Sequence, residues 1–247
     1  MKQGKMKQGK KDLLFAMLDR LYLRLLTTRY FFSPQVKLYH PVESKQRAFT
    51  AKREKGSHER LKAITDVIGE TPSSILDIGS AEGFFSMHLA KKGNFVVAIE
   101  GKKQRSMIGQ IVSRNNNLNN VSFYNLNLDL GNANQLPDFD NVLCLAVWHH
   151  WVRIKNLDYA NKLLAVIWSK TKERMFFETG LEELSENFNL KGNNESWLLN
   201  NLTKNLKDSK IVEIAESTSF SPEEFESSKI KSESSVFKRK LYLIERK

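Results

Sequence analysis

Blocks of apolar and polar residues alternate along the chain and predict strands and helices in turn. Short apolar runs typical of buried strands occupy residues 74–78, 94–99, 121–128, 140–147, 174–178, 211–215 and 236–244. Apolar positions at helical spacing occupy residues 58–68, 82–92, 102–115, 157–170 and 195–206. Strands that alternate with helices favour an α/β fold with a mostly parallel sheet covered on both faces.

A segment of different character precedes these blocks. Within residues 11–32, apolar side chains recur at helical spacing: Leu14, Met17, Leu18, Leu21 and Leu25. Arg20 and Arg24 share the opposite side of the same helix. Such a helix either packs on the main domain or binds a membrane or partner, and the sequence leaves both open. We predict a basic helical extension at residues 1–57 and a main domain at residues 58–247.

The charge of the chain is concentrated in its N-terminal quarter. Residues 1–63 hold 16 Lys and Arg against 5 Asp and Glu, which accounts for the whole formal net charge of +11. The rest of the chain is neutral in sum. A local excess of this kind attracts anionic partners, such as a membrane surface, a phosphorylated glycan or RNA.

Several classes of protein are disfavoured by what the sequence lacks. The single cysteine, Cys144, excludes an internal disulfide and lies in an apolar run, so we expect it to be buried. We expect no metal site, because no Cys and His cluster is present. No long uncharged apolar run or secretory signal is visible. We therefore expect a cytoplasmic protein, associated at most with the inner membrane surface.

The stretch SILDIGSAEGFF, at residues 74–85, joins a strand to a helix through two glycines. Gly79 permits a sharp turn after Ile78, and Gly83 lets the helix approach a strand or a ligand. Ligands of doubly wound sheets bind at such turns, at the carboxyl ends of the strands. The spacing Gly-x-x-x-Gly differs from the dinucleotide fingerprint Gly-x-Gly-x-x-Gly. The stretch is not a P-loop either, because no Gly-Lys-Ser/Thr follows.

Polar side chains end the first three strands of the main domain. Asp77 suits an ammonium group, and Glu100 is placed to accept hydrogen bonds from both hydroxyls of a ribose. Asn127 follows the third strand, where it can read an adenine edge, with Asp129 as a second candidate. S-Adenosylmethionine combines an ammonium group, a ribose and an adenine.

The motif SILDIGSAEGFFS, the AIEG that ends the second strand and the order of elements resemble the class I S-adenosylmethionine-dependent methyltransferases. The resemblance covers residues 58–247. It implies a Rossmann-like doubly wound, mostly parallel seven-stranded sheet with one antiparallel strand, and S-adenosylmethionine as cofactor. The sequence departs from the family pattern at Ala81, which replaces a glycine, and at Asn127, where aspartate is commoner.

The resemblance also implies roles for single residues. Asp77, Gly79 and Gly83 form the methionine side of the cofactor pocket, Ser80 and Phe84 line it, Glu100 holds the ribose, Asn127 and Leu128 flank the adenine, and Leu145 to Val147 face the sulfonium. All of these positions follow residue 76. We therefore expect the N-terminal quarter to contribute nothing to the cofactor site.

Two histidines follow the fourth strand, in the run Val-Trp-His-His-Trp at residues 147–151. From this position the family reaches its methyl acceptor. His149 or His150 is thus a candidate general base for a hydroxyl or phosphate. Alternatively, one histidine caps the loop while the tryptophans cover the cofactor. Glu178 should point into the same crevice, either to orient a histidine or the acceptor, or in a structural hydrogen bond.

The absence of several motifs limits the chemical classes of methyl acceptor that we expect. The chain lacks an Asn/Asp-Pro-Pro-Tyr/Phe motif, a Pro-Cys motif and a clear Lys-Asp-Lys-Glu set, which disfavours DNA-base, C5 and ribose methylation. The histidine pair and DIGSAEGFFS are similar to bacterial methyltransferases that act on surface-glycan ends. We expect an oxygen acceptor, in a small molecule or in the sugar or phosphate group of a glycan. An RNA methyltransferase and a non-catalytic S-adenosylmethionine-binding protein remain the alternatives.

Overall fold

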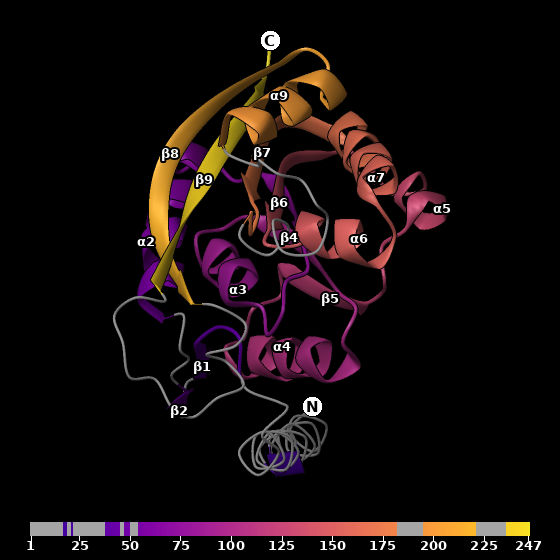
Figure 1. Cartoon of the computed structure of the whole chain (residues 1–247). Helices are drawn as coiled ribbons and strands as arrows, with labels where there is room; N and C mark the ends of the chain where they lie inside the picture. The colour runs from indigo at the N-terminus through magenta and orange to yellow at the C-terminus, as the bar shows by residue number, and fades with distance from the viewer. Residues whose placement is uncertain are drawn as a thin grey trace.

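A seven-stranded sheet forms the centre of the computed structural model, which describes residues 17, 18, 21, 38–44, 47–49, 54–181, 195–220 and 236–247 (Figure 1). Its strands are β3 (Ser74–Ile78), β4 (Phe95–Glu100), β5 (Val121–Asn125), β6 (Phe139–Leu145), β7 (Thr171–Glu178), β8 (Ser209–Phe220) and β9 (Val236–Arg246). The strand order is β5-β4-β3-β6-β7-β9-β8. Strands β3 to β7 are parallel, and β9 runs antiparallel to both β7 and β8. The predicted Rossmann-like, mostly parallel sheet is confirmed.

The strand order reverses beside β3, which pairs with β4 on one side and β6 on the other. Connections leave this point toward opposite edges of the sheet, so a crevice opens at the carboxyl ends of these strands. The glycine turn follows β3 directly. Topology therefore places the predicted cofactor residues at the position where doubly wound sheets bind ligands.

Helices cover both faces of the sheet (Figure 1). One face carries α2 (Glu54–Ile68), α3 (Phe84–Lys91) and α4 (Lys103–Asn115), and the other carries α5 (Leu130–Ala133), α6 (Trp148–Ile154), α7 (Leu157–Ser169) and α9 (Glu195–Asn205). Each face has its own apolar core. Neighbouring residues of β3 divide between the cores, Ile75 in one and Leu76 in the other, as the two-residue period of a strand requires.

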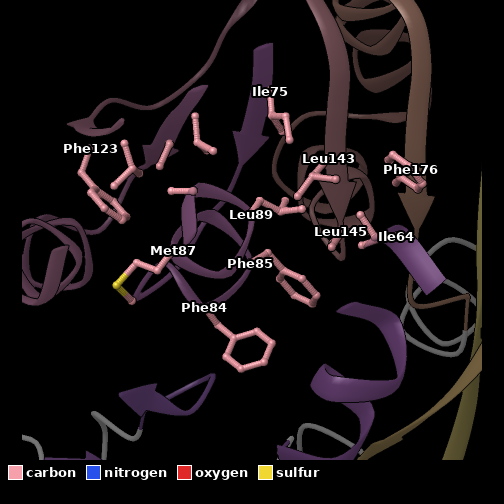
Figure 2. Close-up of a cluster of buried hydrophobic side chains, with 14 of the residues drawn as sticks. Ile64, Ile75, Phe84, Phe85, Met87, Leu89, Phe123, Leu143, Leu145 and Phe176 are labelled. Carbon is pink, nitrogen blue, oxygen red and sulfur yellow. The ribbon is translucent and has the colours of Figure 1, made fainter. Parts of the chain in front are cut away.

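The core under α2 and α3 draws side chains from both helices and from the strands beneath them. Figure 2 shows Ile64 of α2 and Leu89 of α3 pointing toward Leu143 and Phe176 of β6 and β7. Phe123 of β5 fills the space beside α3 and α4. A Cβ atom at Gly83 or at Gly109 would fall inside van der Waals contact of its ring, so both glycines are needed for this close packing.

The predicted element bounds agree with the structure to within a few residues, except that β8 extends well beyond residues 211–215. Four short elements were not predicted: α5, α6, and the two-stranded sheet of β1 (Val42–Ser44) and β2 (Arg47–Phe49). Elements of three to seven residues have too few positions to display a period.

Part of the predicted N-terminal helix is described. Met17, Leu18 and Leu21 have helical backbone and are 59%, 47% and 53% exposed; the rest of residues 11–32 lies outside the described residues. Among the described residues, no helix is both long and apolar enough to cross a bilayer. Val42 is buried in the first core, so part of the predicted extension packs on the main domain, and the boundary at residue 57 stays a prediction.

Candidate active site

A cavity of about 1030 Å³ lies at the carboxyl ends of the parallel strands. Its wall includes Tyr39, Ile78, Gly79, Ala81, Glu100, Lys102, Arg105, Asn127, Leu128, Asp129, Leu145, Ala146, Val147, His150, Trp151, Lys155 and Tyr159. The loops after β3, β4, β5 and β6 all contribute to this wall. A cavity of this size can hold a nucleoside cofactor together with part of a second substrate.

The cavity divides the predicted site residues into two groups. Gly79, Glu100, Asn127, Leu128, Leu145, Val147 and His150 line it. Asp77, Ser80, Gly83, Phe84, His149 and Glu178 are not among its lining residues. The structure thus brings the ribose, adenine and sulfonium candidates together, and it gives several of the other residues a supporting position.

The turn at Gly79 contributes backbone, without a side chain, to the cavity wall. Gly79 has a φ of 68°, and a Cβ atom there would lie 2.5 Å from Cγ2 of Val147. Its backbone N–H and that of Ser80 both donate to the carbonyl of Ile99, at 2.8 and 3.1 Å, which ties the turn to β4. A side chain larger than hydrogen would fill the cradle that a ligand needs.

Glu100 reaches the cavity with a fixed orientation. Its Oε2 accepts a hydrogen bond from the backbone N–H of Ala81 at 3.0 Å, and its Oε1 accepts one from that of Lys102 at 2.7 Å. The residue is 7% exposed. Each carboxylate oxygen keeps a further lone pair for a hydroxyl, so the geometry suits a ribose diol.

Asp77 lies on the other side of its strand from the cavity. Ile78 lines the cavity, and the side chain before it points to the opposite face, where Oδ2 accepts a hydrogen bond from the Ser86 hydroxyl. Burial raises the pKa of Asp77 to about 6, against the lowering effect of that bond, and the charge of Glu100 raises it further. Asp77 thus anchors the first turn of α3, and its contact with the amino group of the cofactor stays a prediction.

Phe84 and Ser80 also differ from expectation. Phe84 is 1% exposed and packs against the rings of His40, His58 and His88, away from the cavity wall. Ser80 is 4% exposed, and its hydroxyl has no hydrogen-bond partner among the described residues. An unsatisfied buried hydroxyl beside the glycine turn suits a ligand with polar groups.

The loop after β5 forms the side of the cavity where the sequence predicts the adenine. The Asn127 side chain lies against Gly101, where a Cβ atom would clash with its amide. Asp129 caps α5 and accepts hydrogen bonds from the backbone N–H groups of Gly131 and Asn132, each at 2.9 Å. Asp129 is therefore committed to a helix terminus, which leaves Asn127 as the first candidate for an adenine contact.

The two histidines after β6 take different positions. His150 is exposed on the cavity wall. His149 is 1% exposed, and its Nδ1 accepts a hydrogen bond from the backbone N–H of Gly180 at 3.2 Å and lies 3.3 Å from the Thr179 hydroxyl. This matches the second interpretation of the pair, in which one histidine holds the loop. Of the two, His150 is placed to meet an acceptor.

Glu178 does not point into the crevice. Both of its carboxylate oxygens lie 3.0 Å from Nη1 of Arg60, and the two side chains are 1% and 3% exposed. The pair joins the end of β7 to α2. Glu178 therefore makes a structural contact, which is one of the two roles that the sequence left open for it. Arg60 belongs to the basic N-terminal quarter, and burial removes this guanidinium from contact with an anionic partner.

Sequence reasoning missed part of the cavity wall. Lys102 and Arg105 follow Glu100 closely in the sequence, so their nearness to a predicted site residue is a signal for both. Tyr39 precedes the glycine turn by 40 residues, and no local pattern connects the two. Because Tyr39 lines the cavity, the expectation that the N-terminal quarter contributes nothing to this site is wrong.

Comparisons with known proteins agree with this geometry. A family model described as a methyltransferase domain matches residues 76–174. The O-antigen chain terminator bifunctional methyltransferase/kinase WbdD of Escherichia coli is 30% identical over 116 residues, which are 44% of this chain and 16% of that protein. The chain thus spans about a sixth of this curated relative.

Solved structures share the fold. A WbdD crystal structure aligns with a TM-score of 0.62 at 20% identity, over 90% of this chain and 46% of that chain. EvdMO1 gives 0.56 at 18% identity, over 83% of this chain and 44% of that chain. Magnesium protoporphyrin IX methyltransferase of Synechocystis PCC 6803 with bound S-adenosylmethionine gives 0.53 at 15% identity, over 77% and 80%.

Three independent observations now converge. The glycine turn and Glu100 form a cavity wall suited to S-adenosylmethionine, the strand order is that of a doubly wound sheet, and the methyltransferase-domain model runs from within β3 to within β7. Residues 76–174 therefore match a methyltransferase domain, and they lie in a fold that this chain shares with solved methyltransferase structures.

Proposed function

We propose that this protein transfers the methyl group of S-adenosylmethionine to an oxygen acceptor, and that the acceptor is a phosphate or sugar group of a glycan. The observation that carries the proposal is the position of His150, exposed on the wall of the cavity that also contains Glu100. A histidine at this place can accept the proton of a hydroxyl or hold a phosphate oxygen.

Transfer of this kind requires positioning more than covalent chemistry. The acceptor oxygen attacks the methyl carbon in line with the breaking carbon–sulfur bond, and the sulfonium leaves as a neutral thioether. A new carbon–oxygen bond forms, and His150 takes the acceptor proton where there is one. The enzyme contributes mainly by holding the two reactants in this alignment.

The charge of the cavity wall favours an anionic acceptor. Lys102, Arg105 and Lys155 line the cavity against the acids Glu100 and Asp129. Lys102 and Lys155 are exposed, so their ammonium groups are accessible to a ligand. A phosphate would gain from these two ammonium groups, since charge-assisted hydrogen bonds are about twice as strong as neutral ones. The name of WbdD, an O-antigen chain terminator, supports a glycan.

The basic N-terminal segment is the proposed contact with an anionic surface. Met17, Leu18 and Leu21 are exposed on helical backbone, and apolar side chains of this kind favour a membrane surface at the cytoplasmic side over RNA. Deleting residues 1–32 should weaken co-sedimentation with anionic vesicles while cofactor affinity stays nearly unchanged. Unchanged vesicle binding by the truncated protein would refute this part of the proposal.

A transfer assay tests the function. The full chain and methyl-labelled S-adenosylmethionine are incubated with separate fractions of small metabolites, glycans, phosphatase-treated glycans and RNA. We expect label in the glycan fraction and less label after phosphatase treatment. Label in RNA would favour the RNA methyltransferase, and tight cofactor binding without transfer to any fraction would favour the non-catalytic alternative.

Matched histidine variants test the role of His150. His150→Gln should lower transfer at least tenfold, as expected for loss of a general acid or base, and should leave cofactor affinity unchanged. His58→Gln is the control, because His58 is exposed and does not line the cavity. Equal activity of the two variants would exclude His150 from catalysis.

A further inference from the structure

A short segment ahead of the main domain reaches the cofactor cavity. Residues 38–40, called the strap here, carry Tyr39, which lines the cavity. The strap is fastened to the glycine turn: the backbone N–H of Tyr39 lies 3.3 Å from both carboxylate oxygens of Glu82, and that of His40 lies 3.4 Å from Oε2. Glu82 lies between the two glycines of the turn and is fully buried.

Arg105 completes the attachment from the other side. Its Nε lies 3.4 Å from Oε1 of Glu82, and its guanidinium carbon lies 5.3 Å from the centroid of the Tyr39 ring. Arg105 also lines the cavity. Glu82, Arg105 and Tyr39 are called the Glu82 cluster. One acid thus binds the backbone of the strap and a cation that contacts the strap's aromatic ring.

A buried carboxylate is costly to the fold unless it is paired and hydrogen-bonded. Burial raises the pKa of Glu82, and Arg105 together with the N–H groups of Tyr39 and His40 opposes that rise. An apolar residue at this position would avoid the desolvation cost, but it would provide no acceptor for the strap. The cluster therefore has a local purpose, which is to hold residues 38–40 against the turn.

The strap has a second attachment through His40. This residue is 5% exposed, its Nδ1 lies 2.8 Å from the Ser57 hydroxyl, and its ring stacks on Phe84 with centroids 5.9 Å apart. His40 joins the strap to α2 and α3, while Glu82 joins it to the glycine turn. Tyr39 is thus held from both sides at one place on the cavity wall.

We propose that Tyr39 is a positioning residue for the cofactor, and that the strap, fastened by the Glu82 cluster, retains S-adenosylmethionine in its cavity. The strap binds the same turn that cradles the cofactor, so cofactor and strap stabilise the same conformation of that turn. The proposal rests on the cofactor assignment and is independent of the methyl acceptor.

The test measures how fast the cofactor leaves. Binding to the full chain is measured by titration calorimetry with S-adenosylmethionine, and dissociation by stopped-flow displacement with its demethylated product. Tyr39→Ala should accelerate dissociation about tenfold, the effect of losing one aromatic contact. Tyr39→Phe should restore slow dissociation, because the ring forms the contact. Tyr124→Ala is the control, since Tyr124 is 55% exposed and lies outside the cavity wall.

Glu82→Gln distinguishes the strap from a simple side-chain contact. Glu82 is not among the cavity-lining residues, yet this variant should also accelerate dissociation, because it loses the ion pair and one acceptor for the strap. The double variant Tyr39→Ala/Glu82→Gln should dissociate no faster than Tyr39→Ala alone, since both act through one contact.

Two results would overturn the proposal, and a third would remove the assignment on which it rests. Dissociation from Tyr39→Ala at the wild-type rate would exclude the strap from cofactor retention, even if Glu82→Gln failed to fold. Multiplying effects in the double variant would show that Glu82 acts separately from Tyr39. Absence of any cofactor binding by the wild-type chain would instead remove the cofactor assignment itself, so the two failures are distinguishable.

Discussion

The guanidinium of Arg60 contacts both carboxylate oxygens of Glu178 at 3.0 Å, and neither side chain is more than 3% exposed. Arg60 lies on α2 and Glu178 at the end of β7, so the ion pair attaches α2 to the sheet. This attachment lies next to Gly180, whose backbone N–H donates a hydrogen bond to His149. A buried ion pair is sensitive to the loss of one partner, because the other then remains buried and uncompensated.

Glu178→Ala should therefore lower the free energy of unfolding by about 3–5 kcal/mol, since it strands the Arg60 guanidinium. Urea unfolding followed by circular dichroism measures this loss. The double variant Arg60→Met/Glu178→Leu should recover much of it, because both charges are removed together. A loss below 1 kcal/mol in the single variant would contradict the structural role assigned to Glu178.

The stability of the protein should depend on pH through Asp77. Its pKa in the folded protein is raised from 3.8 to about 6, chiefly by burial, so the folded state binds this proton more tightly than the unfolded state. The resulting contribution is complete below pH 4 and is lost as the pH rises through 6. Asp77→Asn should increase the free energy of unfolding at pH 7.5 by up to about 3 kcal/mol, and the gain should vanish near pH 4.

Urea unfolding of both proteins at pH 4, 6 and 7.5 checks this difference. Asp66→Asn is the control, because Asp66 is largely exposed and its pair with Lys62 contributes little. Destabilisation by Asp77→Asn at every pH would contradict the sign. A large loss of cofactor affinity in the same variant would restore the direct contact that the sequence indicated.

Ala81 occupies a backbone conformation that favours glycine. Its φ is 50°, a left-handed value that costs a residue with a Cβ atom roughly 1–2 kcal/mol. Ala81→Gly should therefore stabilise the protein by about 1 kcal/mol and retain cofactor binding, because the backbone N–H that donates to Glu100 is kept. Thermal unfolding measures the gain. A lower midpoint in the glycine variant would show that the Cβ atom of Ala81 has packing value.

Glu100 should be essential for cofactor affinity. Its oxygens accept hydrogen bonds from Ala81 and Lys102 and, as proposed, from the ribose hydroxyls. Glu100→Ala should weaken binding of S-adenosylmethionine more than tenfold, because each hydrogen bond to a charged group contributes about 1.5–3 kcal/mol. Titration calorimetry measures this change. Micromolar binding that survives the substitution would remove Glu100 from the cofactor site.

The sequence is most informative where a side chain that can bind a ligand stands at the end of an apolar run that predicts a strand. The apolar run before Gly79 and the acid at Glu100 end two neighbouring parallel strands, so topology alone brings them together. The histidine pair at positions 149 and 150 is predicted near this edge for the same reason, since β6 also ends there. Residues that directly follow a strand are predictable, because they stay close to the edge of the sheet at which that strand ends.

Other residues depended on information that spacing does not contain. Asp77 and Ile78 are adjacent, and only the direction of the pleat decides which one faces the cavity. His149 and His150 likewise divide according to how α6 begins. Tyr39 is brought to the site by Glu82, through contacts between segments separated by 43 residues. Tertiary contacts of this kind leave no period in either segment.

The ring of Phe123 also has an evolutionary consequence. It fills the space left by the absent side chain of Gly109, so the volumes at these two positions are coupled. A larger residue at position 109 requires a smaller one at position 123. Conversely, a phenylalanine at position 123 requires a glycine at position 109. Among relatives that keep this sheet, the two positions should therefore change together, and Gly109→Ala should be tolerated only beside a reduced partner such as Phe123→Leu.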